Sequence, residues 1–248
     1  MPYTALFAET VTMQGHQNDV IDAYLARPMG PGPYPGVVVI HHMPGWDEAT
    51  KEIARKFAYH GYVAISPNLH FREGKATPAE NAVSVRAKGG MPDDRAMGDI
   101  QGAIAHLRNL PYLNGKVGMI GYCSGGRQAY LAACTLTGID TAVDCYGGGV
   151  VMKPEELTEH QPVAPIDYTK DLTCPLLGLF GADDQRPSPE DAAKTEAELK
   201  KWDKTYEFHL YENAAHAFFS VDSLNYRPKA AMDGWQKIFR WYETYLGK

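Results

Sequence analysis

Short apolar segments alternate with amphipathic helical patterns along the chain, and this alternation constrains the fold more than any other feature. Segments typical of strands lie at residues 36–41, 62–67, 116–121, 142–147, 175–181 and 205–212. A strand buried on both faces reads as a short, continuous apolar segment. Strands that alternate with helices pair mostly in parallel, and helices then cover both faces of the sheet. We therefore predict an α/β fold around a mostly parallel central sheet.

Helix signals fall between these strands. Asp47 can cap a helix that follows it, and apolar residues recur at helical spacing over residues 93–109. Ser188 and Pro189 fit the N-cap and first position of another helix. We also expect a last helix at residues 228–245 and an antiparallel strand pair at the sheet edge, within residues 3–26.

The chain has 248 residues and no low-complexity linker, so we expect one domain over residues 1–248. Two polar segments, 70–96 and 150–170, interrupt the order of strands and helices and are candidate insertions. The second segment fits a lid or a surface loop equally well.

Composition excludes several classes of partner. Acidic residues outnumber basic ones 30 to 24, which gives a formal net charge of −6 and disfavours a nucleic-acid or anionic-membrane surface. No apolar segment approaches the roughly 20 residues of a membrane-spanning helix. The first residues lack the pattern of a signal peptide, so we expect a cytoplasmic protein.

The segment Gly121–Gly126 reads GYCSGG and follows a predicted strand. A nucleophile on a tight strand-to-helix turn needs small residues two positions before and after it, because side chains there would collide with backbone. Cys123 meets this requirement, whereas Ser124 fails because Tyr122 stands two positions before it. The following helix N-terminus favours a Cys123 thiolate, and the Ser124 backbone N–H faces the position of a developing oxyanion.

A thiol nucleophile needs a base, and the base needs a group that orients it. Three histidines follow Cys123 along the chain: His160, His209 and His216. His160 lies in a polar loop and His209 lies within a predicted strand. His216 comes just after that strand, which is the position expected of a catalytic histidine in this chain order.

The acid is expected directly after the strand at 175–181, where the sequence offers Asp183 and Asp184. Both are loop carboxylates at the same end of the sheet as Cys123 and His216. The pattern alone does not separate them.

The remaining three cysteines, Cys134, Cys145 and Cys174, are interpreted as small buried hydrophobic residues. A redox-sensing or binding module built on a reactive Cys123 is the alternative of a different class. It would need a resolving cysteine, and Cys134 lies about three helical turns from Cys123.

The adjacent residues His41 and His42 do not by themselves form a metal site. A zinc site needs three or four spaced ligands, and no second cluster with suitable spacing occurs in the sequence. We therefore expect neither a metal nor an organic cofactor.

In this order, the motifs resemble those of the dienelactone hydrolase family, the cysteine branch of the α/β hydrolases. GYCSGG is similar to the family's G-x-C-x-G-G elbow, FGADD at 180–184 to its acid turn, and AAHAF at 214–218 to its histidine motif. The likeness spans nearly the whole chain. It implies an α/β-hydrolase fold and a triad of Cys123, Asp184 and His216, because the family's aspartate stands three residues after the glycine.

The resemblance also implies a reaction. A small-molecule ester or lactone would acylate Cys123 with assistance from His216, and water would then hydrolyse the thioester, as in a carboxymethylenebutenolidase-like enzyme. The backbone N–H of Met43 corresponds to the family's second oxyanion donor, beside that of Ser124. Acyl transfer to an acceptor other than water uses the same triad and stays open.

Two departures from the family pattern concern the pocket. The family's diene-lactone specialists hold a substrate carboxylate with arginines, one of them shortly after the histidine, whereas no basic residue follows His216 before Arg227. The candidate replacements, which we interpret as solvated loop charges, are Arg72, Arg86 and Arg95. The expected pocket residues are His42, Trp46, Tyr146 and Phe218. The aromatic side chains of Trp46, Phe218 and the neighbouring Phe219 suit a more apolar ester or lactone.

The second departure is His42, which stands where the family carries a glutamate. We hypothesise that its imidazole stabilises the Cys123 thiolate or donates a hydrogen bond to substrate. The first version predicts that the thiol of Cys123 titrates at higher pH in the His42→Ala variant. A titration of the variant that matches the parent would contradict it.

Overall fold

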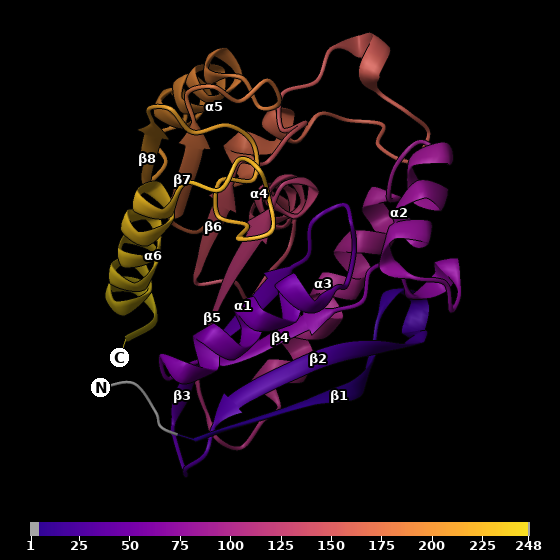
Figure 1. Cartoon of the computed structure of the whole chain (residues 1–248), viewed down its shortest axis with the longest axis vertical. Coiled ribbons are helices and arrows are strands. Elements are labelled where there is room, and N and C mark those ends of the chain that lie inside the picture. The colour runs from indigo at the N-terminus through magenta and orange to yellow at the C-terminus, as the bar shows by residue number, and fades with distance from the viewer. Residues whose placement is uncertain (1–4, 248) are drawn as a thin grey trace.

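The computed structural model describes residues 5–247 and contains a central eight-stranded sheet (Figure 1). The strands in chain order are β1 (Leu6–Gln14), β2 (Val20–Pro28), β3 (Tyr34–Ile40), β4 (Val63–Pro67), β5 (Leu113–Tyr122), β6 (Thr141–Cys145), β7 (Leu176–Gly181) and β8 (Tyr206–Tyr211). They are arranged in the order β1-β2-β4-β3-β5-β6-β7-β8. Only β1 with β2 and β2 with β4 pair antiparallel. The predicted α/β fold with a mostly parallel sheet is confirmed.

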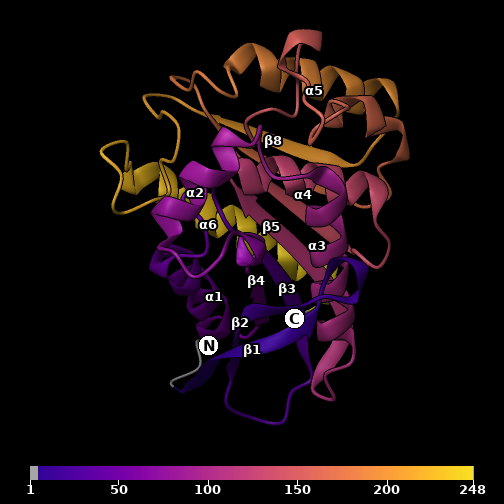
Figure 2. The ribbon, with the colours of Figure 1, turned by 90° about the vertical axis from the view of Figure 1, so that its right-hand side faces the viewer.

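Six α-helices accompany the sheet over the described residues. They are α1 (Glu48–Tyr59), α2 (Pro78–Ala87), α3 (Asp93–Arg108), α4 (Ser124–Thr135), α5 (Pro189–Lys201) and α6 (Pro228–Tyr242). Helices α1 and α6 pack on one face of the sheet, and α3, α4 and α5 pack on the other (Figures 1 and 2). Strand β3 shows why both faces are apolar: Val37 and Val39 point to the first face, and Val38 and Ile40 to the second.

Most expected boundaries agree with the structure to within a few residues. Asp47 caps α1 by accepting a hydrogen bond from the Thr50 N–H, and Ser188 caps α5 in the same way. The antiparallel pair expected within residues 3–26 is β1 with β2, although residues 3 and 4 lie outside the described range. The last helix ends at Tyr242, and a wider π-type turn, Glu243–Gly247, follows it.

Helix α2 was not predicted, and it lies inside the polar segment 70–96. Its start does carry a capping signal, because the Thr77 hydroxyl accepts from the Glu80 N–H and the Glu80 carboxylate accepts from the Thr77 N–H. The helix lacks a clear apolar stripe, since its buried residues are Asn81, Ala82 and Val85. The hydrophobic pattern alone therefore could not reveal it.

Parallel pairing places the ends of β3, β5, β6, β7 and β8 at one edge of the sheet. The loops that follow these strands carry the residues on which the expected chemistry depends. Ligands of such sheets bind at this carboxyl edge. Within residues 5–247, no helix combines the length and apolar character needed to cross a membrane.

Asp144 in β6 is a buried carboxylate that lies against Gly126 in the first turn of α4. Its Oδ1 accepts a hydrogen bond of 2.7 Å from the Gly147 N–H. Burial nevertheless raises the pKa of Asp144 from its ordinary value to about 7. The folded protein therefore holds this proton over a pH range in which the unfolded chain releases it.

This difference predicts how stability depends on pH. The stabilising contribution of the protonated carboxyl is complete below about pH 4 and is lost as the pH rises through about 7. Relative to the parent, an Asp144→Asn variant should gain free energy of unfolding between pH 4 and 7, by at most about 1.4 kcal/mol per pH unit. Urea denaturation at several pH values measures the difference, and a pH-independent difference would show that Asp144 does not titrate in this range.

Candidate active site

Cys123 lies at the turn between β5 and α4 with φ of +56°, a backbone conformation that is rare for residues with a side chain. The flanking glycines make this turn possible. A Cβ on Gly121 would overlap the carbonyl oxygen of Gly125. A Cβ on Gly125 would overlap the carbonyl of Ile40 and lie 2.7 Å from the carbonyl oxygen of His41. The glycine spacing expected around the nucleophile thus has a direct steric cause.

His216 follows β8 and reaches the acid that follows β7. Its Nδ1 lies 2.8 Å from Oδ2 of Asp184, whose other carboxylate oxygen accepts a 2.9 Å hydrogen bond from the Arg186 N–H. The Asn225 side chain donates to the backbone carbonyl of His216 at 3.0 Å. Asp184 is 2% exposed, whereas the alternative carboxylate, Asp183, is exposed at the surface.

Cys123 and His216 form a hydrogen-bonded pair whose two pKa values move in opposite directions. Burial alone raises the pKa of the Cys123 thiol, but hydrogen bonds from His216 and from the backbone N–H groups of Met43 and Ser124 lower it below its ordinary value. Burial alone lowers the pKa of His216, but its bonds with Asp184 and Cys123 raise it overall. The arrangement therefore favours a thiolate beside an imidazolium.

The two amides that bond to the sulfur come from different elements. The Ser124 N–H belongs to the first turn of α4, and the Met43 N–H belongs to the loop after β3. Both therefore lie close to the Cys123 sulfur. The structure thus brings together the two backbone donors expected for an oxyanion hole.

His42 bonds to a carboxylate of the loop that leads into α1. Its Nε2 lies 2.6 Å from Oδ2 of Asp47, the residue that caps α1. The neighbouring His41 is buried and accepts a hydrogen bond from the Leu69 N–H at 3.2 Å. The pair of histidines after β3 is therefore held by the surrounding loops.

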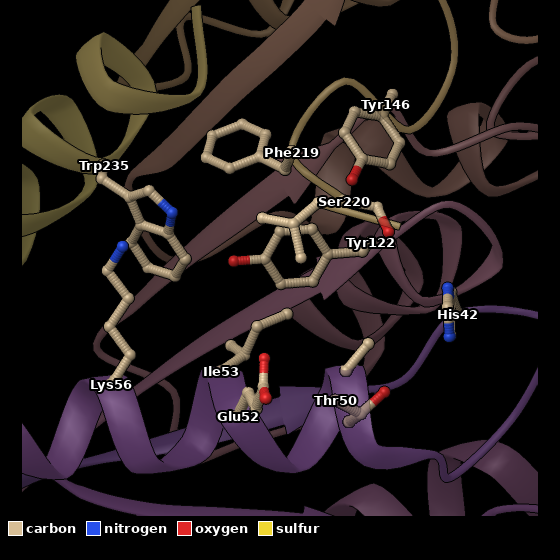
Figure 3. A pocket seen from close by; sticks show the side chains of 12 residues that line it. His42, Thr50, Glu52, Ile53, Lys56, Tyr122, Tyr146, Phe219, Ser220 and Trp235 are labelled. Atoms are coloured by element: carbon tan, nitrogen blue, oxygen red, sulfur yellow. The ribbon is translucent and has the colours of Figure 1, made fainter. Parts of the chain in front are cut away.

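A cavity of about 230 Å³ opens between α1, α6 and the loop after His216 (Figure 3), and Tyr122, which precedes Cys123, lies in its wall. Its lining residues are His42, Ala49, Thr50, Glu52, Ile53, Lys56, Tyr122, Tyr146, Phe219, Ser220, Val221 and Trp235. His42 and Tyr146 were expected there from the sequence. The α1 and α6 residues were not, because no motif marks a helix side chain that faces a cavity from a distant part of the chain.

Two residues expected in the pocket do not line this cavity. The Trp46 indole N–H donates instead to the carbonyl of Ser66 at 3.0 Å. Phe218 is fully buried and packs in the core against Tyr146, with ring centroids 5.4 Å apart. Phe219 lines the cavity in its place.

The candidate arginines of segment 70–96 do not line the cavity either. Arg72 forms ion pairs with Asp19 and Asp99, at 2.7 and 2.8 Å. Arg95 pairs with the buried carboxylate of Glu73 at 2.9 Å, and Arg86 is exposed. The first two arginines therefore tie the surrounding segments together.

The other histidine candidates have separate partners. The Nδ1 of His160 bonds to the carbonyl of Gly90 at 3.0 Å, which fastens segment 150–170 to the loop before α3. His209 in β8 bonds to Glu207 at 2.6 Å.

The remaining cysteines are buried, and burial raises the pKa of each of them: Cys134, Cys145 and Cys174. Across the part of the chain that the structure describes, no group of three or more metal-binding side chains is assembled.

Comparison with known proteins agrees with this geometry. The sequence model of the dienelactone hydrolase family matches residues 21–246. The chain belongs to this family. Like other members, it is a hydrolase of ester or lactone bonds, and the resemblance inferred from its motifs is confirmed.

Relatives match over nearly the full chain. A protein of Methylorubrum extorquens, provisionally named a carboxymethylenebutenolidase, is 30% identical over 232 residues, which cover 92% of this chain and 78% of the relative. A protein of Escherichia coli with the same provisional name is 30% identical, and the match covers 94% of this chain and 85% of the relative. A provisionally named dienelactone hydrolase from Klebsiella pneumoniae, known from its crystal structure, is 30% identical in sequence. The two structures match with a TM-score of 0.88 over 98% of this chain and 100% of the other.

The coupled pKa values predict the reactivity of the thiol. Alkylation of Cys123 by iodoacetamide should show a midpoint at lower pH than that of an ordinary thiol. In His216→Ala the midpoint should rise, because burial raises the pKa of the Cys123 thiol and the hydrogen bond from His216 that lowers it is lost. Mass spectrometry across a pH series measures the rate, with Cys123→Ala as the background control. An unchanged midpoint in His216→Ala would contradict the pairing.

Proposed function

We propose that this protein hydrolyses small-molecule esters or lactones through a triad of Cys123, His216 and Asp184. One observation carries the proposal: a partly buried cysteine bonded to a histidine, which is itself held by a buried carboxylate, at the carboxyl edge of the sheet. This is the arrangement that an activated nucleophile needs.

Acylation begins with attack of the Cys123 thiolate on the substrate carbonyl. The backbone N–H groups of Met43 and Ser124 stabilise the oxyanion of the tetrahedral intermediate. The His216 imidazolium gives its proton to the leaving alkoxide, and a thioester remains on Cys123. Amides are poorer substrates, because a thiolate leaves the intermediate more readily than an amine.

Deacylation uses the same groups in the reverse direction. Neutral His216 takes a proton from water, and the hydroxide equivalent attacks the thioester carbonyl. Collapse of the second intermediate releases the carboxylic acid and restores the thiolate–imidazolium pair. Asp184 keeps the imidazole in the required orientation through its bond to Nδ1.

No observation favours the redox-sensing alternative over this proposal. A sensor of that kind needs a second reactive thiol near the first. The other three cysteines are buried, and their pKa values are raised.

A substrate panel with nucleophile variants tests the proposal. The panel consists of short and longer p-nitrophenyl esters, simple lactones and a dienelactone. Cys123→Ala should lower kcat/KM by about 10³-fold or more, because the attacking group is lost, and Cys123→Ser should restore little of it. The matched control is Cys134→Ala, which removes a buried thiol elsewhere. Turnover that survives in Cys123→Ala would contradict the choice of nucleophile.

A further inference from the structure

Two phenol groups in the cavity lack hydrogen-bond partners. The Tyr122 hydroxyl is buried and unpaired, and no hydrogen bond among residues 5–247 involves the Tyr146 hydroxyl. The side chains are deeply enclosed, since Tyr122 is 5% and Tyr146 2% exposed. A buried polar group without a partner is a cost to the free protein, so the unpaired Tyr122 hydroxyl at this cavity calls for an explanation.

Both tyrosines adjoin the catalytic residues. Tyr122 directly precedes Cys123, and the Tyr146 ring meets the His216 ring edge-on with centroids 5.2 Å apart. Tyr146 also adopts φ of +44°, which is an unusual conformation for an aromatic residue. Backbone strain of this kind persists where the surrounding structure holds a side chain in place, and it clusters at functional sites.

The rest of the cavity suits an aromatic group. Phe219, Trp235 and Ile53 complete its apolar walls, and Figure 3 shows the Tyr122 hydroxyl directed to the side where Trp235 lies. The volume of 230 Å³ exceeds the about 150 Å³ known to accommodate a benzene molecule. Flat walls of aromatic side chains favour a flat ring between them.

The charged residues of the lining do not favour a carboxylate. Glu52 and Lys56 carry opposite charges, and both extend from α1. The Lys56 ammonium lies over the Trp235 ring, 4.2 Å from its centroid. An uncharged ligand therefore fits this balance better than an anion does.

We propose that Tyr122 and Tyr146 determine specificity, by selecting substrates whose group in this cavity is an uncharged aromatic ring bearing a hydrogen-bond acceptor. This inference rests on the proposed function, because the ring must belong to an ester or lactone held at Cys123. Burial raises the pKa of both phenols well above the ordinary value, so both remain hydrogen-bond donors at any working pH.

Thermal stability distinguishes hydroxyls that bind the ligand from hydroxyls that stabilise the fold. If the hydroxyls serve the ligand, Tyr122→Phe removes a buried unpaired polar group from the free protein, and Tyr146→Phe breaks no hydrogen bond within residues 5–247. Their thermal midpoints should then equal or exceed that of the parent. If the hydroxyls instead hold the structure together, both midpoints should fall.

Two matched pairs of esters test the selection. One pair is the acetates of 3-phenylpropanol and 3-(4-pyridyl)propanol, and the other is the ethyl esters of 4-phenylbutanoate and 4-(4-pyridyl)butanoate. In each pair the ring nitrogen adds only an acceptor, and the methylene chain insulates the reacting carbonyl from it. The two pairs place the ring on the alcohol side and on the acyl side, respectively. At pH 8 the pyridyl group is uncharged.

The readout is the ratio of kcat/KM for the pyridyl ester to that for the phenyl ester. In at least one pair, this ratio should fall about threefold to tenfold in Tyr122→Phe and in Tyr146→Phe, as expected for one lost neutral hydrogen bond. The control is Tyr206→Phe, whose hydroxyl bonds to Glu196 away from the cavity and whose ratio should match the parent.

Ratios that stay unchanged in both variants and both pairs, with turnover still dependent on Cys123, would overturn this inference and leave the proposed function standing. Lower thermal midpoints in both variants would also overturn it, since the hydroxyls would then be structural. Turnover that persists in Cys123→Ala would overturn the proposed function and this inference with it.

Discussion

The close approach of two backbone segments is the constraint on which the rest of the site depends. Gly125 at the start of α4 lies against the carbonyl groups of Ile40 and His41 at the end of β3, with no room for a side chain. This contact fixes the nucleophile turn and the loop that carries the Met43 N–H relative to each other. The sulfur of Cys123 and its two amide donors are therefore positioned by the sheet itself and need no side-chain adjustment.

Electrostatic interactions then determine the charge state of Cys123. Burial opposes a charge on either Cys123 or His216, but the two charges offset each other across their hydrogen bond. Asp184, which is nearly inaccessible to solvent, supports the imidazolium from its other side. The same enclosed surroundings leave the buried Tyr122 hydroxyl without a partner. The site thus gathers several polar groups in one enclosed part of the molecule.

The sequence predicted the parts of this molecule that depend on local rules. Alternating apolar segments indicated the sheet, and the glycines around Cys123 indicated the turn, because steric limits of this kind act over a few residues. Asp184 and Asp183 could not be separated by such rules, since the distinction depends on which carboxylate faces His216. Trp46 and Phe218 lie outside the cavity for a similar reason: the side on which an aromatic ring packs is decided by residues distant in sequence, here Ser66 and Tyr146.

The central claim is that the acyl group passes through a thioester on Cys123. The protein can be incubated with a slowly hydrolysed ester such as p-nitrophenyl pivalate, quenched in acid and digested with trypsin. The peptide spanning residues 117–127 then carries both Cys123 and Ser124. Fragment ions that place the pivaloyl group on Cys123 are the predicted result. An acyl group on Ser124, or turnover without any acylated form of this peptide, would contradict the account.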